Sequence, residues 1–201
     1  MNDNEMIDAR FEMLKKHHTQ TLNDAITNGL VDKPIISFLE KITEIPTMFT
    51  SSSCSGRIML LIGDEDENKK NSSFLKKFHE RVSLKEIKEQ LANLPSTGVV
   101  WLKAEPFIFH FGLKDYFSAK ALLDFCRSFG LKKAGIISAK EGKFTCEVTN
   151  TVYLSTVLAK DGKILVSEEY LSLLVDIANQ KLENNFKKLD LFISSFLSFF
   201  A

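Results

Sequence analysis

The sequence of 201 residues has few cysteines and no surplus of charge of either sign, and each shortage excludes a class of protein. The three cysteines, Cys54, Cys126 and Cys146, are odd in number and form no Cys-x-x-Cys pair, which argues against a disulfide framework or a structural zinc site. Lys plus Arg and Asp plus Glu are 26 each, so the net charge is zero. Nonspecific DNA-binding proteins normally carry surplus positive charge, and this chain is not of that class.

Familiar nucleotide and metal motifs are also absent. The sequence has no Gly-x-Gly-x-x-Gly after its first strand, no Walker loop and no His-Glu-x-x-His, so a Rossmann cofactor site is not expected. Residues 1–16 are charged and lack the apolar core of a signal peptide. The apolar run 191–200 is about half as long as a membrane span requires. We therefore expect a soluble, cytoplasmic protein.

The rest of the composition is typical of a globular protein, with 44% hydrophobic and 26% charged residues. Helical spacing of apolar residues and capping signals predict helices over residues 3–27, 33–45, 84–94, 115–129 and 168–200. Alternating and β-branched runs predict strands over residues 47–51, 57–63, 73–80, 98–113, 132–138, 143–149, 151–159 and 163–167. The order predicts a single α/β domain over residues 1–201, with one mixed sheet flanked by helices.

A short internal echo raises the hypothesis of a duplicated unit. Ser52-x-x-x-Gly56-Arg57 and Ser138-x-x-x-Gly142-Lys143 each precede a predicted strand. Two turns built from a glycine and a basic residue also arise by chance, so both interpretations stay open.

The stretch "TSSSCSGR", residues 50–57, leads directly into an apolar strand. A turn in which hydroxyls bond the backbone and Gly56 takes a positive φ explains about two of these polar residues. A pocket floor explains the whole stretch, because hydroxyls and backbone N–H groups bind a carboxylate, ribose or phosphate while Arg57 fixes an anion. A nucleophilic Cys54 is a third interpretation, although it needs a base that the local sequence does not display.

Several other polar residues have two interpretations each. His110 lies among bulky apolar residues and is either a buried, hydrogen-bonded histidine or a general base. Glu105 is a strand-end or a surface carboxylate. Asp32 is a good helix N-cap, whereas Asp24 has no evident structural duty. The adjacent His17–His18 pair is expected to be solvated, because neighbours in sequence do not face one another on a helix.

Four segments together resemble the tRNA wybutosine-synthesising protein 3 family. "TSSSCSGR" looks like that family's (Ser/Thr)-x-Ser-Ser-Cys-x-Gly-Arg signature, and "KAEPFIFHF" resembles its Glu-Pro-Phe-x-x-His block. "SEEYLSLLVDIANQKLENN" resembles its C-terminal helix, and "DAITNGLVD" resembles its Asp-spacer-Gly-x-x-Asp pattern. The matches run from about Asp24 to Asn185, which is nearly the whole chain.

The resemblance implies an S-adenosylmethionine-dependent methyltransferase with its own α/β fold rather than a Rossmann core. Family members methylate N4 of the 4-demethylwyosine-type tricyclic base at position 37 of tRNA-Phe, so the implied partner is the anticodon loop of that tRNA. A non-catalytic RNA-binding module that presents this loop is the alternative. A cysteine hydrolase is a more distant one.

The family's active centre combines its Ser-Cys motif with an aspartate and a histidine. Carried over to this sequence, the catalytic residues are Asp24, His110, Ser53 and Cys54, with Asp32 as the alternative aspartate. The residues expected to bind the cofactor are Thr50, Ser52, Ser53, Gly56 and Arg57. The residues expected to bind the substrate are Arg57, Glu105 and, as an aromatic on which the base could stack, Trp101.

Overall fold

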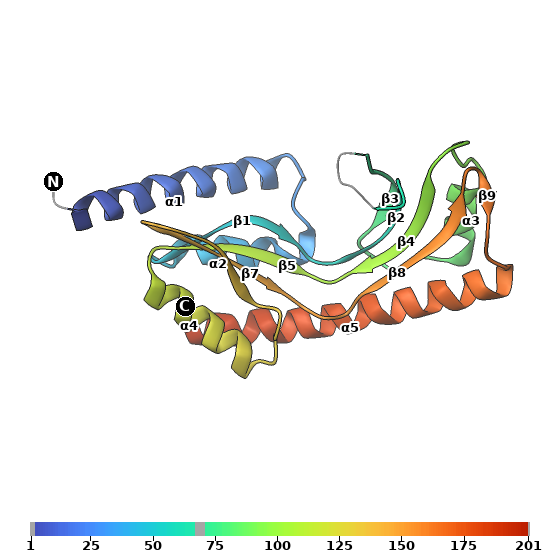
Figure 1. The fold of residues 1–201 in the computed structure, drawn as a ribbon. Coiled ribbons are helices and arrows are strands. Elements are labelled where there is room, and N and C mark those ends of the chain that lie inside the picture. Colours follow the sequence, from blue (N-terminus) through green and yellow to red (C-terminus); the bar gives the residue numbers. More distant parts are fainter. Residues whose placement is uncertain (1–2, 67–70, 201) are drawn as a thin grey trace. The chain divides into compact units, whose positions relative to one another are not determined.

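A computed structural model describes residues 3–66 and 71–200, the side chains of residues 3 and 4 excepted (Figure 1). The helices are α1 (Asp3–Thr27), the 3-10 turn η1 (Lys33–Ile35), α2 (Ile36–Glu44), α3 (Leu84–Leu91), α4 (Tyr116–Ser128) and α5 (Glu168–Phe200). The strands are β1 (Met48–Cys54), β2 (Arg57–Gly63), β3 (Ser73–Phe78), β4 (Val99–Glu105), β5 (Ile108–Leu113), β6 (Gly135–Lys140), β7 (Lys143–Thr149), β8 (Leu154–Lys160) and β9 (Lys163–Ile164).

The chain divides into two compact units. Unit 1 comprises Met1–Ser55, Phe107–Thr151 and Lys188–Ala201, and unit 2 comprises Gly56–Pro106 and Val152–Lys187. Each unit has its own sheet, ordered β1-β5-β7-β6 in unit 1 and β3-β2-β4-β8-β9 in unit 2. One domain over residues 1–201 stays a prediction, since compact units can belong to a single cooperatively folding domain.

Phenylalanine side chains build the core of unit 1. Phe107, which precedes β5, and Phe109 and Phe111 on β5 are fully buried, because alternate residues of an extended segment point to the same face. Their rings contact those of Phe192 and Phe196, from the end of α5. Such ring pairs add to the free energy of area burial and fix the geometry of the core.

The other face of the unit 1 sheet packs against α1 through Phe49. The Phe49 ring stacks on His18 at 4.6 Å between centroids and contacts Phe11 at 5.6 Å. Phe49 is paired in register with Gly112, where a Cβ atom would lie 2.2 Å from the Phe49 ring. Only glycine leaves room for the ring at that position, so this pair places α1 against the sheet.

Aliphatic side chains build the core of unit 2. Ile58 and Leu60 of β2 and Leu102 of β4 pack against apolar residues of α3 and α5, and the buried part of this core contains no phenylalanine. Helix α3 begins with the predicted capping box, in which Ser83 and Glu86 bond each other's backbone N–H groups. Both helices lie on one face of this sheet.

The α/β class without a Rossmann core is confirmed, but the predicted single mixed sheet is wrong. All strand pairs found in residues 3–66 and 71–200 are antiparallel and fall into two sheets. The predicted continuous run 98–113 is split at Pro106, which separates β4 in unit 2 from β5 in unit 1. Gly56, with φ of 102°, separates β1 from β2 in the same way. Proline lacks the N–H that a ladder needs, and a positive φ is not an extended conformation, so both residues end strands.

The predicted helices at the two ends of the chain are found, whereas the hypothesis of an internal repeat is not supported. The helices over 3–27 and 168–200 are confirmed at both ends. The echo at Gly56 and Gly142 gains no support as a duplication, because Gly142 joins the paired strands β6 and β7 whereas Gly56 precedes a strand of another sheet. None of the helices in the described part of the chain is long and apolar enough to span a bilayer.

Candidate active site

The serine-rich stretch forms an edge strand rather than a turn. β1 runs through Ser51, Ser52 and Ser53 to Cys54, and pairs with β5 on one side only in the described sheet. The prediction that the strand ends at Ser51 and a turn follows is therefore wrong. A bulge in the pairing near Ser51 shifts the register, and Ser52 faces His110 across the strands. Bulges next to functional sites commonly re-aim side chains in this way.

A cavity of about 250 Å³ lies along this strand, and all of its lining residues belong to unit 1. Thr50 and the three serines after it line one side, α1 lines another with residues that include His18, and α2 and the connection before it contribute the rest. An edge strand leaves backbone N–H and C=O groups without ladder partners. The cavity thus combines hydroxyls, edge backbone groups and an apolar wall.

Ser53 provides the most specific sign of a ligand in this cavity. Its Oγ is buried and has no hydrogen-bond partner within residues 3–66 and 71–200. A buried hydroxyl without a partner costs about 1–3 kcal/mol, and such groups call for a ligand or water to satisfy them. Thr50, three residues earlier on the same strand, is also buried.

His110 is held by a carboxylate on the next strand. Its Nε2 lies 2.9 Å from Glu147 Oε2, and the two residues are directly paired between β5 and β7. A carboxylate acceptor favours the tautomer in which Nε2 carries the proton, which leaves Nδ1 as an acceptor. His110 is therefore partly buried and its ring orientation is fixed by Glu147. It is hydrogen-bonded, as one interpretation of the sequence expected, and it keeps a nitrogen that could act as a base, as the other expected.

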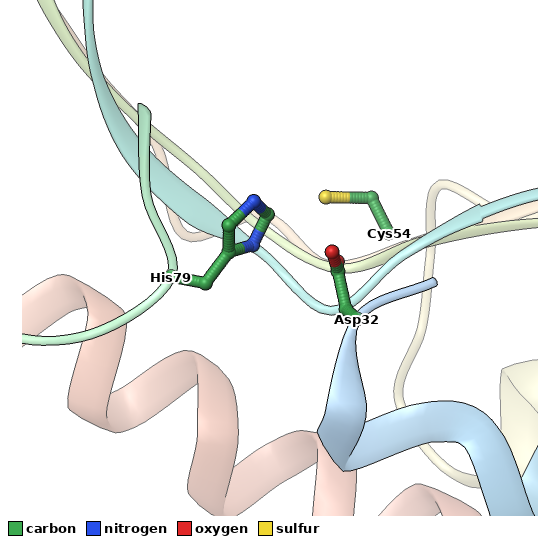
Figure 2. A group of neighbouring side chains, drawn as sticks. All are labelled: Asp32, Cys54 and His79. Carbon is green, nitrogen blue, oxygen red and sulfur yellow. The ribbon is translucent and has the colours of Figure 1, made fainter. Parts of the chain in front are cut away.

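Asp32 is the aspartate that contacts the serine-rich segment. It is the N-cap residue of η1, as predicted, but its side chain makes no cap hydrogen bond. Its Oδ2 instead accepts hydrogen bonds from the Ser55 backbone N–H at 2.7 Å and the Ser55 hydroxyl at 3.1 Å. Cys54 Sγ lies within 4.8 Å of an Asp32 carboxylate oxygen (Figure 2).

The other two cysteines are structural. Both are buried free thiols. Burial raises the pKa of the Cys126 thiol to about 12, and burial raises that of Cys146 to about 11. Such thiols are almost entirely protonated near neutral pH and are chemically inert.

Asp24 lies on the exposed side of α1 near its end. Its carboxylate accepts a hydrogen bond of 2.8 Å from Gln20, and it is not among the residues that line the cavity, although Ala25 next to it is. The structure therefore does not bring Asp24 to the serine-rich strand, and a catalytic role for it stays a prediction.

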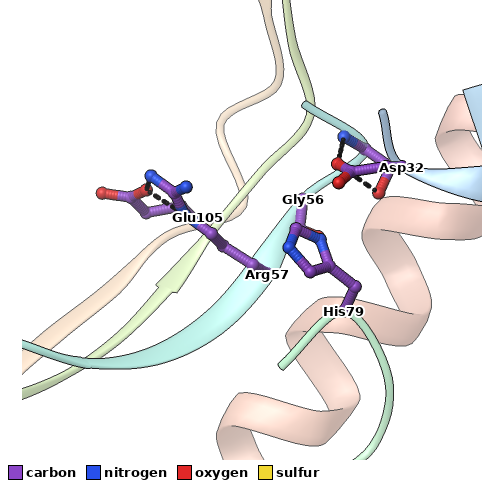
Figure 3. A network of polar contacts seen from close by, with 6 residues as sticks. Asp32, Gly56, Arg57, His79 and Glu105 are labelled. Atoms are coloured by element: carbon purple, nitrogen blue, oxygen red, sulfur yellow. Dashed lines mark hydrogen bonds and ion pairs between the residues drawn. The ribbon is translucent and has the colours of Figure 1, made fainter. Parts of the chain in front are cut away.

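In unit 2, the residues that follow the serine-rich strand form a second polar group (Figure 3). Arg57 donates from Nε and Nη2 to one oxygen of Glu105, at 3.2 and 2.9 Å, and the two residues are register partners on β2 and β4. The Gly56 carbonyl oxygen lies 3.2 Å from Nδ1 of His79. A Cβ atom at Gly56 would lie 2.3 Å from the amide nitrogen of Asn185, so glycine is required there on spatial grounds as well.

Trp101 is on the same strand as Glu105, four residues earlier, and its side chain is partly exposed. Its indole Nε1 is buried and without a hydrogen-bond partner in the part of the chain that the structure covers. Its predicted role in binding the substrate, like those of Arg57 and Glu105, stays a prediction, as does cofactor binding by Gly56 and Arg57.

The structure also points to two histidines that the sequence analysis did not select. His18 was expected to be solvated, but it is half-buried against Phe49 and lines the cavity. Burial lowers the pKa of His18, and the nearby charges of Lys143 and His17 lower it further. Its spacing from Phe11 and Leu22 on the buried stripe of α1 could have revealed it. His79 has no comparable signal in a single sequence.

Comparison with known proteins identifies the family. The model of the family described as Methyltransferase TYW3 matches residues 9–198. The chain belongs to this family. It is therefore a methyltransferase, and a methyltransferase needs a methyl donor.

Relatives in the Methyltransferase TYW3 family match over most of their length. A protein of Pyrococcus abyssi is 37% identical and aligns over 90% of this chain and 93% of its own. A protein of Thermococcus sibiricus is 34% identical and aligns over 92% of this chain and 93% of its own. Both are named as tRNA(Phe) 7-((3-amino-3-carboxypropyl)-4-demethylwyosine(37)-N(4))-methyltransferases. The tRNA wybutosine-synthesizing protein 3 homolog of Xenopus laevis is 33% identical and aligns over 89% of this chain and 72% of its own.

Solved structures agree with this assignment. The PH1069 protein of Pyrococcus horikoshii matches with a TM-score of 0.86 at 34% identity, over 94% of this chain and 96% of that one. A hypothetical protein from Aeropyrum pernix matches with a TM-score of 0.70 at 27% identity, over 81% of this chain and 95% of that one. The family predicted from four sequence motifs is thus confirmed.

Proposed function

We propose that this protein transfers a methyl group from S-adenosylmethionine to N4 of the 4-demethylwyosine-type base at position 37 of tRNA(Phe), in the cytoplasm. The observation that carries the proposal is the match to relatives named for this reaction, over about nine-tenths of both chains. The serine-rich strand, which contains most of the family signature, lines a cavity with an unsatisfied hydroxyl. A non-catalytic RNA-binding module is not favoured, since the matching family is one of methyltransferases.

The cavity along β1 fits part of the cofactor. Its volume of about 250 Å³ is below the range of about 300–1,000 Å³ that is common for ligand pockets, so it would hold one portion of the molecule. The hydroxyls of Thr50, Ser52 and Ser53 would bond polar groups of that portion, and the buried Ser53 Oγ would gain the partner that it lacks. When bound, S-adenosylmethionine supplies a methyl group on a positively charged sulfur.

His110 is the residue best placed to accept the proton that leaves N4. Glu147 fixes its ring through Nε2, and Nδ1 is then available as an acceptor. His110 is paired with Ser52, so base and cavity strand are adjacent in the sheet. The hydroxyls of the serine-rich strand would hold the cofactor, which would supply the methyl group to N4, and His110 Nδ1 would take the proton that leaves N4.

Mass spectrometry of nucleosides tests this proposal. tRNA(Phe) that carries the demethylated base is incubated with the protein and S-adenosylmethionine, and the nucleosides are then separated. We expect the base at position 37 to gain one methyl group, and fragmentation to place it on N4. Tight tRNA binding without any methylation would overturn the assignment and favour the RNA-binding module.

Cys54→Ser separates methyl transfer from a covalent cysteine mechanism. Serine keeps a small polar group of similar size but is a far weaker nucleophile than a thiolate. We expect a rate near that of the wild type, since direct transfer of the methyl group to N4 forms no bond to the Cys54 sulfur. Loss of activity in a folded Cys54→Ser variant would restore the cysteine to a chemical role.

A further inference from the structure

Helices α3 and α5 cover one face of the unit 2 sheet, and no helix in the described part of that unit covers the other face. Residues Ile58, Leu60, Val100, Leu102 and Ala104 point toward α3 and α5. Because side chains alternate, Arg57 and Met59 of β2 and Trp101, Lys103 and Glu105 of β4 point to the opposite face. Met59 and Lys103 are buried there, whereas Arg57, Trp101 and Glu105 are partly exposed. The register adds Phe74 and Lys77 from β3, and Ser155 from β8. We call this set of residues the open face.

An exposed aromatic ring with two cations marks one side of the open face. Phe74 is 45% exposed, which is unusual for a phenylalanine on a strand. The Lys77 ammonium lies 4.2 Å from the centre of its ring, and the Arg57 guanidinium lies 5.2 Å from it. Arg57 is engaged by Glu105, whereas Lys77 has no carboxylate partner among the described residues. The ammonium of Lys77 is thus a positive charge available to an anion.

Two hydrogen-bonding groups without partners mark the centre of the open face. Trp101 Nε1 and Ser155 Oγ are both buried, and neither has a partner in residues 3–66 or 71–200. Lys103, only 6% exposed, is directly paired with Ser155, and its Nζ lies 5.8 Å from the Trp101 ring. An indole N–H is a donor only, so the ligand that satisfies Trp101 must bring an acceptor.

We infer that the open face binds single-stranded nucleotides of the RNA substrate. A base stacks on the exposed Phe74 ring, Lys77 pairs with a phosphate, and the Trp101 N–H donates to a base, ribose or phosphate oxygen. Aromatic residues on an uncovered sheet bind unstacked bases in other RNA-binding proteins, and every base has a π face. An acidic peptide would use the cation but has no flat ring for Phe74. The inference rests on the proposed function, because the RNA is the substrate of that reaction.

Adjacent lysines on β3 provide the sharpest test. Lys77 points to the open face, whereas Lys76 is paired with Leu60 and points to the helix side. Lys77→Gln and Lys76→Gln remove the same charge from the same strand. For Lys77→Gln we expect tRNA(Phe) to bind about three- to tenfold more weakly, and the slope of log K against log salt to fall by about 0.7, the value for one single-strand phosphate contact. Lys76→Gln should match the wild type in both measurements.

Two further variants test the aromatic contacts. Phe74→Leu keeps an apolar side chain but removes the stacking surface, so the Kd for tRNA(Phe) should rise between about fivefold and 150-fold. Trp101→Phe keeps a ring but removes the indole N–H, and should raise KM more than it lowers kcat. Circular dichroism at increasing temperature establishes that each variant is folded.

The outcomes separate this inference from the proposed function. If wild-type protein methylates tRNA(Phe) but Phe74→Leu and Lys77→Gln bind it as tightly as Lys76→Gln does, the open face is not an RNA surface and the proposed function stands. If the wild type neither binds nor methylates tRNA(Phe), both proposals fail. If polyglutamate binds the wild type and loses affinity in Lys77→Gln while tRNA binding is unchanged, the open face binds acidic peptides and the inference is wrong.

Discussion

The two sheets of this protein differ in what covers them. In unit 1, phenylalanines pack against one face of the sheet and α1 packs against the other, so the cavity lined by the serine-rich strand forms at the edge strand β1. In unit 2, helices cover one face only, and the core on that side is aliphatic. A sheet enclosed on both faces offers small, shaped cavities, whereas a sheet with an uncovered face offers a surface for a polymer.

Under our two proposals, the two units have separate tasks. Unit 1 holds His110 and the hydroxyls of the serine-rich strand, which are groups suited to proton transfer and to small-molecule binding. Unit 2 holds exposed aromatic and basic residues, which are suited to RNA. Changes in unit 1 should therefore lower kcat, and changes on the open face should raise KM.

The largest effect is expected from His110→Gln. Glutamine retains a hydrogen bond toward Glu147 but cannot accept a proton from N4, so kcat should fall by about 10²- to 10⁴-fold. The Kd for tRNA(Phe) should stay near that of the wild type, because the proposed RNA surface belongs to the sheet of unit 2. Single-turnover methylation and filter binding measure the two quantities. A wild-type kcat in His110→Gln would show that His110 is not the base that accepts the proton from N4.

Phe109→Ala should have the next largest effect, on stability. Phe109 is fully buried and contacts Phe38, Phe107, Phe111 and Phe192. Its truncation removes a large apolar side chain and leaves a cavity, so the free energy of unfolding should fall by about 3–5 kcal/mol. Urea denaturation measures the loss, with Ile58→Val in unit 2 as a milder comparison at about 0.5–1.5 kcal/mol. Equal losses of unfolding free energy would mean that Phe109 is less tightly packed than its four ring contacts indicate.

Local signals in the sequence predicted local structure well, and the pairing of strands poorly. The Ser83–Glu86 box and the long helix from Glu168 are formed by neighbours in the chain, and both are confirmed. The alternation of apolar and polar residues also identified strands near β4 and β5. This alternation does not indicate which other strand each of them pairs with. One strand was predicted over residues 98–113, whereas the chain passes from one sheet to the other at Pro106.

The candidate site shows the same limit. The family motifs selected the serine-rich strand and His110, which the structure pairs in one sheet. Sequence alone could not choose between Asp24 and Asp32, because the hydrogen bonds to Ser55 join residues 23 positions apart. Contacts of that kind depend on tertiary folding, and neither spacing nor residue type reveals them.

Asp32→Ala and Asp24→Ala distinguish the two aspartates. Asp32→Ala leaves Ser55 without its charged acceptor, so the free energy of unfolding should fall by about 1.5–3 kcal/mol. Asp24 is exposed and bonds only Gln20 through its side chain in the described contacts, so its removal should change stability by less than about 0.5 kcal/mol. Activity measured at a temperature where both variants are folded then decides the catalytic role. Inactivity in Asp24→Ala with full activity in Asp32→Ala would assign the catalytic role to Asp24, and the converse result would assign it to Asp32.

The smallest effect concerns His18 and the pH dependence of stability. Burial lowers the pKa of His18 below its ordinary value of 6.5, so the folded state favours the neutral ring. Stability from this group is present above pH 6.5 and is lost as the pH falls through the folded pKa, because the unfolded chain then binds the proton more readily. His18→Gln cannot titrate, so its urea midpoint should fall less than that of the wild type between about pH 7.5 and 5.5. Parallel pH profiles for the two proteins would show that the wall of the cavity in unit 1 is more open to water than its stacking on Phe49 indicates.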